Sequence, residues 1–315
     1  MSTQRWKLGA AALAAAFFLA GCETVPNVGG GASGLAAALG GAMGGAMGGG
    51  NNSAGMANGI QDVVSGASAV FKDYSPQEQR ALGQEFSSVL LGARPLLRND
   101  AVQRYVNQVG WWVALQAEPP KDKDGRDIQF AWRFGVIDSD AVNAYATPGG
   151  YVFVTVELLR KLNNEAELAG VLAHEVAHVV RGHYLSALKK GGFAQIAGGI
   201  VQTQTRNGGA MTAAMVNAVR NLYAKGLDQS DEFDADRQGL LYAARAGYQA
   251  NGLPKVLRMY AASGSGSDAA YQMLFSTHPA PAERASRLEP LLGSKFAAAS
   301  NVTNEARYLA MRRKL

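Results

Sequence analysis

The stretch from Leu172 to His183, LAHEVAHVVRGH, contains three of the four histidines in a chain of 315 residues. His174 and His178 are four positions apart, and Glu175 directly follows the first of them. On a helix, residues four apart share a face with about 5 to 6 Å between their Cβ atoms. The two imidazoles can therefore converge on one metal ion. Glu175 lies about 100° further around the helix, where it reaches a water on that ion more easily than the ion itself.

The residues before this stretch predict that it lies on a buried helix. Asn164 is a suitable N-cap, and Glu165 and Glu167 supply acidic side chains for the first turn. The apolar positions that follow have helical spacing: Leu168, Val171, Leu172, Val176 and Val179.

The pattern His-Glu-x-x-His matches the needs of a hydrolytic zinc site. Two neutral imidazoles hold the ion, zinc lowers the pKa of its bound water towards about 7, and a carboxylate takes the proton as the water attacks a carbonyl. The alternative is a pair of hydrogen-bonded histidines in the core. A third ligand has to decide between them.

Spacing excludes one type of third ligand. The metzincin pattern requires a glycine three residues and a histidine six residues after the second ligand, where this chain has Arg181 and Tyr184. His183 lies about 180° from His174 on an uninterrupted helix and cannot easily join the same ion.

A later segment, SDEFDADRQG at 230–239, offers an acidic ligand. Glu232 and Asp236 are four apart on a face that also carries Ala235 and Gly239, and such small residues allow a second helix to approach closely. We expect Glu232 to be the third ligand and Asp236 to accept the other N–H of a ligand histidine. The alternative is a solvated acidic face with Arg237 as its ion-pair partner.

These motifs together resemble metallopeptidase family 48, a gluzincin family. The residues that carry the resemblance are HEVAH at 174–178 and Glu-Phe-Asp-Ala-Asp-Arg-Gln-Gly at 232–239. Asn143-Ala-Tyr-Ala with Pro148-Gly-Gly, and Thr277-His278-Pro279 with Arg284, also agree with it. The resemblance covers roughly residues 75–290, and in layout the chain is most similar to the lipoprotein peptidases of that family.

The resemblance implies a role for each matching residue. It makes His174, His178 and Glu232 the ligands of one zinc ion and Glu175 the catalytic general base. Asp236 takes a position sometimes assigned as proton donor.

The resemblance also implies roles for residues outside the two helices. His278 either occupies the open position of the metal in a latent state or stabilises the oxyanion, and its alternative is a surface histidine that caps a helix. The strand formed by Asn143, Ala144, Tyr145 and Ala146 would bind substrate as an added strand and read its side chains only loosely.

The remaining pattern predicts an α+β fold that is mostly helical, a zincin-like metallopeptidase domain with the His-Glu-x-x-His helix at its active site. Helices are expected at 76–91 and 100–116. Strands are expected at 128–137 and 151–156, paired in a small antiparallel sheet, with 143–146 as an edge strand. The Gly- and Ala-rich segment 191–226 predicts mobile helices or a lid, with a transmembrane hairpin as the minority alternative.

The N-terminus predicts export and lipidation. Residues 1–21 have the basic start and short apolar run of a signal peptide, and Leu-Ala-Gly-Cys at 19–22 resembles a bacterial lipobox. Lipidated Cys22 would then hold the chain to a membrane. Glu23 is not the aspartate that retains many lipoproteins at the inner membrane, so we expect an outer-membrane location facing the periplasm of a Gram-negative bacterium.

Composition predicts a flexible tether at 22–70, followed by one metallopeptidase domain at 71–315. The tether is rich in Gly and Ala and too poor in large side chains to form a core. Gly40, Gly44 and Gly48 leave open a close-packed helix contact as the alternative. Without 1–21 the net charge is about +3 and the basic residues are spread out, which gives no case for nucleic acid.

The expected function is zinc-dependent endopeptidase activity on unfolded or misassembled envelope polypeptides, in possible contact with the outer-membrane protein assembly machinery. One alternative is a chaperone-like assembly factor that binds unfolded strands with little proteolysis. Another is a domain whose zinc is purely structural.

Overall fold

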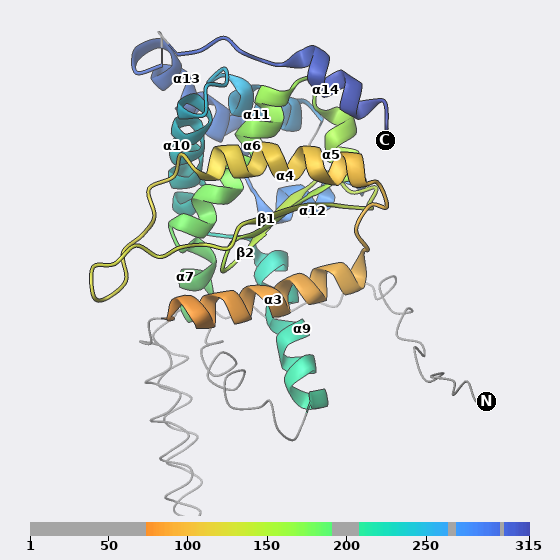
Figure 1. The fold of residues 1–315 in the computed structure, drawn as a ribbon, viewed down its shortest axis with the longest axis vertical. Helices are drawn as coiled ribbons and strands as arrows, with labels where there is room; N and C mark the ends of the chain where they lie inside the picture. The colour runs from red at the N-terminus through yellow and green to blue at the C-terminus, as the bar shows by residue number, and fades with distance from the viewer. Residues whose placement is uncertain (1–73, 191–207, 264–268, 297–298) are drawn as a thin grey trace, which may run out of the picture. The chain divides into compact units, whose positions relative to one another are not determined.

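The computed structural model describes residues 74–190, 208–263, 269–296 and 299–315 (Figure 1). The signal peptide, Cys22 and the tether predicted for 1–70 lie outside these ranges, as does 191–207 of the Gly-rich segment. The helices are α3 (Pro76–Ala93), α4 (Asp100–Ala114), α5 (Val156–Lys161), α6 (Glu165–Val180), α7 (His183–Lys190), α9 (Gly208–Lys225), α10 (Gln229–Arg245), α11 (Gly252–Ala262), α12 (Ala269–Thr277), α13 (Pro281–Ser294) and α14 (Glu305–Arg312). The strands are β1 (Arg133–Ile137), β2 (Ala144–Thr147) and β3 (Tyr151–Thr155).

The prediction of a mostly helical α+β fold is confirmed, but the sheet is mixed. Its strand order is β1-β3-β2, with β2 at one edge as expected. β2 pairs antiparallel with β3, whereas β1 pairs with β3 in parallel, Arg133 opposite Tyr151. The expected antiparallel pairing of the segments 128–137 and 151–156 is therefore wrong. The chain reverses once between β1 and β2 and again between β2 and β3, so β1 and β3 run in the same direction.

The turn between β2 and β3 depends on its two glycines. Gly149 and Gly150 have φ values of 79° and 101°, which side chains on other residues disfavour. A Cβ atom on Gly149 would also lie 2.7 Å from the Cα atom of Arg80 in α3. The turn thus packs directly on the backbone of that helix.

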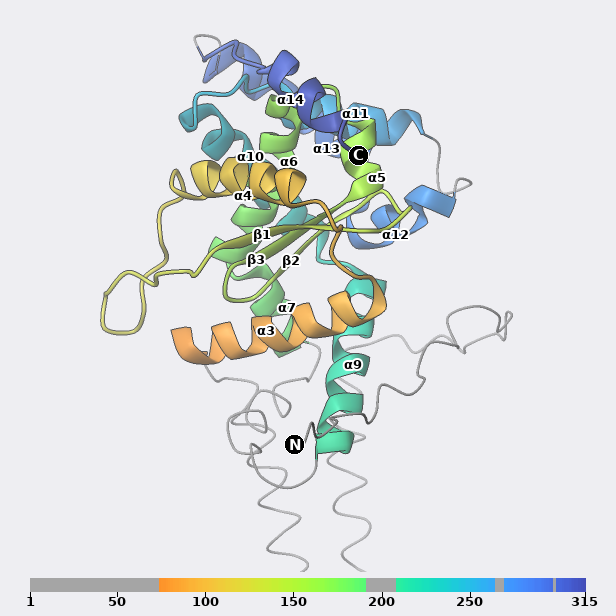
Figure 2. The ribbon, with the colours of Figure 1, turned by 45° about the vertical axis from the view of Figure 1, so that its right-hand side comes forward.

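Two helices lie on opposite sides of the sheet in both views, α4 on one and α3 on the other (Figures 1 and 2). The helix expected at 76–91 is α3, and it begins with a capping box in which Ser75 and Glu78 each bond to the other's backbone N–H. On α4, four valines with helical spacing form an apolar face and are all buried: Val102, Val106, Val109 and Val113.

α6 is the central helix, and every residue from Glu165 to Val179 is buried. The side chain of Asn164 caps it as predicted, accepting from the N–H of Glu167. A helix this apolar on all faces is stable only when other elements surround it. In the described ranges, no helix combines the length and apolar character needed to cross a membrane.

Candidate metal centre

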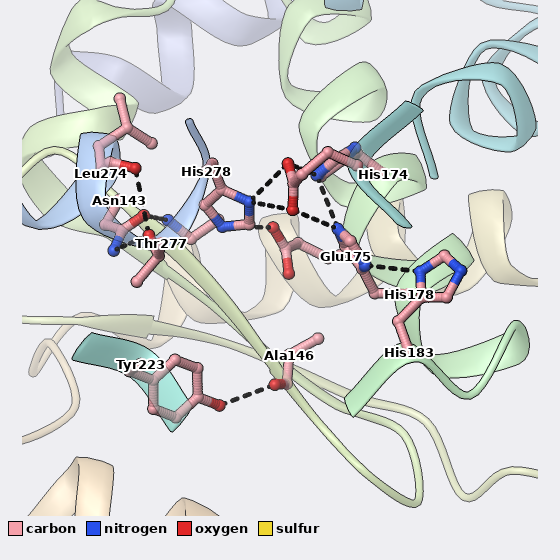
Figure 3. Close-up of polar contacts among 12 residues, drawn as sticks. Asn143, Ala146, His174, Glu175, His178, His183, Tyr223, Leu274, Thr277 and His278 are labelled. Atoms are coloured by element: carbon pink, nitrogen blue, oxygen red, sulfur yellow. Dashed lines mark hydrogen bonds and ion pairs between the residues drawn. The ribbon is translucent and has the colours of Figure 1, made fainter. Parts of the chain in front are cut away.

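The α6 helix brings His174 and His178 together as the spacing predicts. Their Nε2 atoms are 3.0 Å apart, and the two rings are buried and nearly perpendicular, at 88° (Figure 3). Two ring nitrogens thus face the same small volume from one turn of helix.

The α10 helix supplies the acidic partner. Glu232 is fully buried, with one carboxylate oxygen 3.3 Å from Nε2 of His178 and the other 3.5 Å from Nε2 of His174. Asp236, one turn further along, lies 3.0 Å from Nδ1 of His174. The alternative of a solvated acidic face is wrong, because both carboxylates are buried and Arg237 pairs with the neighbouring Asp234 instead.

The spacing of these atoms fits a tetrahedral zinc ion. Ligand atoms bound at about 2.0 to 2.2 Å lie about 3.4 Å from one another in that geometry. The nearest separations among His174, His178 and Glu232 range from 3.0 to 3.5 Å, with a different oxygen of Glu232 closest to each ring. With His278 included, one ligand atom from each of the four residues lies within 4.8 Å of the others. Two or three imidazoles and a carboxylate form a donor set that zinc accepts.

Arg284, on α13, neutralises the two carboxylates. Its guanidinium lies 2.7 Å from Glu232 and donates two hydrogen bonds to Asp236. Burial acts against ionisation of both acids, but the charge of Arg284 holds the pKa of Glu232 well below its usual range and lowers that of Asp236 to about 2. Both acids are therefore carboxylates at neutral pH, as metal binding requires.

The two histidines differ in basicity. Burial and Arg284 act to lower the pKa of His174, but hydrogen bonds with Asp236 and Glu232 outweigh them and raise it to about 9. Burial, together with the charge on His174, lowers the pKa of His178 to about 3. Metal binding needs both rings neutral, so it must displace the proton from His174.

Glu175 lies beside the cluster rather than within it. Its side chain is buried, its Oε1 atom is 3.6 Å from Nε2 of His278, and its Oε2 atom has no hydrogen-bond partner among the described residues. Burial raises the pKa of Glu175 above its usual value. A buried carboxylate oxygen without a partner is costly and needs a functional explanation.

His278 follows α12 and turns inward. It is 6% exposed, and its Nδ1 atom lies 3.1 Å from Glu232 (Figure 3). The alternative of a surface histidine that caps a helix is therefore wrong. Its ring centroid is 5.4 Å from that of His174, close enough to join the donor cluster or to contact a group bound there.

The predicted substrate strand lies at the sheet edge, and two of its backbone groups, the N–H of Ala144 and the carbonyl of Ala146, already have hydrogen-bond partners within the chain. The N–H of Ala144 bonds to the side chain of Asn143, whose amide also bonds to Thr277. The carbonyl of Ala146 accepts a hydrogen bond from the hydroxyl of Tyr223 on α9, at 2.8 Å (Figure 3).

Three contributors were not assigned a role from the sequence. Arg284 entered only as part of a motif, although two buried acids one turn apart imply a buried cation nearby. His183, excluded as a ligand, contacts the far side of His178 at 2.8 Å between their Nδ1 atoms. Nothing in the sequence around Tyr223 predicts its hydrogen bond to Ala146 of the edge strand β2.

Comparison with known proteins agrees with this geometry. Residues 100–291, more than half of the chain, match the sequence profile of Peptidase family M48. The chain belongs to peptidase family M48. Both helices of the donor cluster and His278 lie inside the matched range.

The individual relatives of this M48 chain share only a quarter to under a third of their aligned residues with it. The beta-barrel assembly-enhancing protease of Yersinia pestis is 25% identical over 236 residues, which cover 72% of this chain and 46% of the relative. Its counterpart in Escherichia coli (strain K12) is 25% identical, covering 66% and 42%. The mitochondrial metalloendopeptidase OMA1 of Homo sapiens is 29% identical, covering 56% and 33%. The chain thus spans less than half the length of each, and all three names describe proteases or endopeptidases.

Proposed function

We propose that this chain is a zinc-dependent endopeptidase that hydrolyses peptide bonds of unfolded or misassembled envelope polypeptides. The observation that carries the proposal is the donor cluster itself. Four ligand atoms from His174, His178, Glu232 and His278 lie within 4.8 Å of one another, beside a buried Glu175 oxygen with no partner among the described residues. Membership of family M48 supports the same reaction class.

The residues divide the work as follows. His174, His178 and Glu232 would hold the ion, with Asp236 orienting His174 through its Nδ1 atom. When bound, zinc would supply Lewis acidity and lower the pKa of a water molecule in the site. Glu175 would accept a proton from the water that attacks the scissile carbonyl, and its raised pKa suits a general base.

His278 has two roles compatible with its position. In a latent state its imidazole would bind the ion together with the other three residues. In the active state it would move aside and donate a hydrogen bond to the oxyanion. Glu232 and Glu175, the two acids that it faces, are held on other helices, so a movement of the segment after α12 suffices.

Substrate binding by the edge strand Asn143–Ala146 requires an extended polypeptide. Hydrogen bonds to the main chain ignore side-chain identity, which favours unfolded segments over folded ones. The carbonyl of Ala146 becomes available to such a segment once the hydroxyl of Tyr223 releases it.

The proposed location is the periplasmic face of the outer membrane, with lipidated Cys22 as the attachment point. The names of the bacterial relatives, beta-barrel assembly-enhancing proteases, support contact with outer-membrane protein assembly as a further part of the proposal.

The decisive experiment compares the wild type with Glu175→Gln on an unfolded protein substrate, with Glu289→Gln on the exposed face of α13 as the matched control. We expect one zinc ion per chain in all three proteins by mass spectrometry. Cleavage should fall by at least a hundredfold in Glu175→Gln alone, since a positioned general base typically contributes ~10² to 10⁴ in rate.

Each alternative function predicts a different result. A chaperone-like factor would suppress aggregation of the substrate equally well in wild type and Glu175→Gln, with negligible cleavage by either. A purely structural zinc would make Glu232→Gln unfold rather than remain folded and inactive, which a thermal melt with and without chelator detects. Undiminished turnover by Glu175→Gln would rule out this residue as the base.

A further inference from the structure

His183 is a buried histidine that the proposed reaction does not use. It is the first residue of α7 and is 6% exposed. Its Nδ1 atom lies 2.8 Å from Nδ1 of His178, on the side of that ring opposite the donor cluster (Figure 3). The other nitrogen of His178, Nε2, faces Glu232 and His174. Both nitrogens of His178 are thus committed, one to the cluster and one to His183.

The far side of His183 faces acids. Its Nε2 atom is 3.5 Å from a carboxylate oxygen of Asp234 and 3.9 Å from one of Asp231. Asp234 is itself held by Arg181, at 2.6 Å, and by Arg237, at 3.1 Å. A row of contacts therefore runs from His178 through His183 to a fixed carboxylate.

The direction of the hydrogen bond between His178 and His183 follows from what a metal ligand requires. To offer a lone pair at Nε2, neutral His178 must carry its proton on Nδ1. That proton is then donated to Nδ1 of His183, whose own proton must sit on Nε2, on the side of Asp234. We propose that His183 is a positioning residue that fixes the tautomer and ring orientation of His178 for metal binding.

The two ligand histidines would then be supported in different ways. His174 has a carboxylate, Asp236, at its Nδ1 atom. His178 has a neutral imidazole, with a carboxylate one step further away. A second carboxylate directly behind His178 would add charge to a cluster that already holds two, and an imidazole orients the ring without doing so.

The chain reaches this position through Gly182. That residue has a φ of 69° and separates α6 from α7, so His183 begins a new helix instead of continuing the old one. Residues other than glycine are strained at this φ. The short sequence Arg181-Gly182-His183 thus contributes the turn, the ring, and one of the two arginines that hold Asp234.

A pair of substitutions tests the inference, which rests on the proposed metal site. His183→Asn keeps an oxygen acceptor close to the place of Nδ1, because both atoms are bonded to Cγ. His183→Leu keeps the bulk but has no acceptor. Zn²⁺ affinity of the full chain would be measured by competition with a chromogenic chelator, and the fold of each metal-free protein by circular dichroism.

We expect His183→Leu to bind Zn²⁺ about 10 to 100 times more weakly than the wild type, the usual effect of losing the partner of a ligand histidine. His183→Asn should stay within a few-fold of the wild type. Equal affinity of wild type and His183→Leu would overturn the inference, as would equally weak binding by folded His183→Asn.

The affinity of the wild type separates failure of the proposed function from failure of this inference. If the wild type itself binds no Zn²⁺, the proposed function fails. If the wild type and His183→Leu both bind Zn²⁺ tightly, only the role of His183 is removed. If His183→Leu does not fold, His183→Asn is compared with His183→Gln, whose oxygen lies one methylene further out. Restoration by Asn and not by Gln supports an acceptor at Nδ1, and equal affinity of the two contradicts it.

Discussion

Gly239 shows how one residue without a side chain sets the geometry of the candidate metal centre. A Cβ atom at this position would lie 2.8 Å from the backbone N of His174 and 3.0 Å from its Cα atom. Both are main-chain atoms in the middle of α6, so they cannot rotate away as a side chain would. The close approach of α10 to α6, and with it the position of Glu232, therefore depends on glycine here.

We predict that Gly239→Ala forces the two helices apart and weakens Zn²⁺ binding by at least tenfold. Overpacking of this kind should also cost about 1 to 3 kcal/mol of stability. Gly293→Ala on α13 is the matched control, since a Cβ atom there meets nothing within 4 Å. Alanine is the better helix former, so the control should be neutral or slightly stabilised. Chelator competition and thermal melts check both; unaltered affinity in Gly239→Ala would contradict the prediction.

The site residues could be predicted from the sequence only as far as helical periodicity reaches. His174 and His178, and separately Glu232 and Asp236, were each placed on one face by their spacing, and the small Gly239 indicated a close helix contact. The exclusion of His183 as a ligand agrees with the donor cluster, which does not contain it. Its contact with His178 could not be predicted, because the helical angle does not extend past Gly182, where α6 has already ended. Arg284 lies 48 residues beyond Asp236, a separation over which periodicity carries no information.

At the scale of elements, the edge strand β2 is the part of the proposed substrate site that depends most on its neighbours. Its strand composition could be read from the sequence, but its partners could not, because pairing depends on how often the chain reverses. The ring of Tyr223 packs edge-on against that of Tyr145, with centroids 5.6 Å apart, and its hydroxyl bonds to Ala146. If substrate binds here as proposed, α9 competes with it for this edge.

We predict that Tyr223→Phe increases kcat/KM for an unfolded substrate about fivefold. The substitution keeps the ring contact but removes one hydrogen bond, worth about 1 kcal/mol, that substrate must otherwise displace. Tyr151→Phe, on the central strand β3, serves as the control and should leave kcat/KM unchanged. A decrease in Tyr223→Phe would show that the hydroxyl supports the active form of the strand.

At the scale of the whole described domain, Glu165 joins segments that are far apart in the sequence. This first residue of α6 is fully buried. It accepts hydrogen bonds from Tyr105 on α4, Tyr248 after α10, and Asn304 and Arg307 at α14. Burial acts to raise the pKa of Glu165, but the bonds from Arg307 and the other donors outweigh it and lower the pKa below 4.5. The charged form is thus favoured by folding, and the network holds α14 against the helix that carries His174 and His178, the proposed metal ligands.

We predict that Glu165→Gln destabilises the metal-free protein by about 2 to 3 kcal/mol at pH 7. Removing one partner from a buried ion pair usually costs ~3 to 5 kcal/mol, and the exposure of Arg307 to solvent reduces that penalty. Because the folded pKa is depressed, this contribution is present above pH 4.5 and is lost as the pH falls below it. The stability difference between wild type and variant should therefore shrink in acid.

Urea unfolding between pH 3 and pH 7, with chelator present to separate this network from the metal centre, measures that difference. Glu305→Gln, on the exposed first turn of α14, is the matched control and should track the wild type at every pH. A difference that stays constant down to pH 3 would mean that Glu165 acts through packing alone. A stability difference that shrinks in acid would show that the attachment of α14 depends on the ionisation of one buried carboxylate, that of Glu165. This residue is the first of α6, the helix that carries His174 and His178.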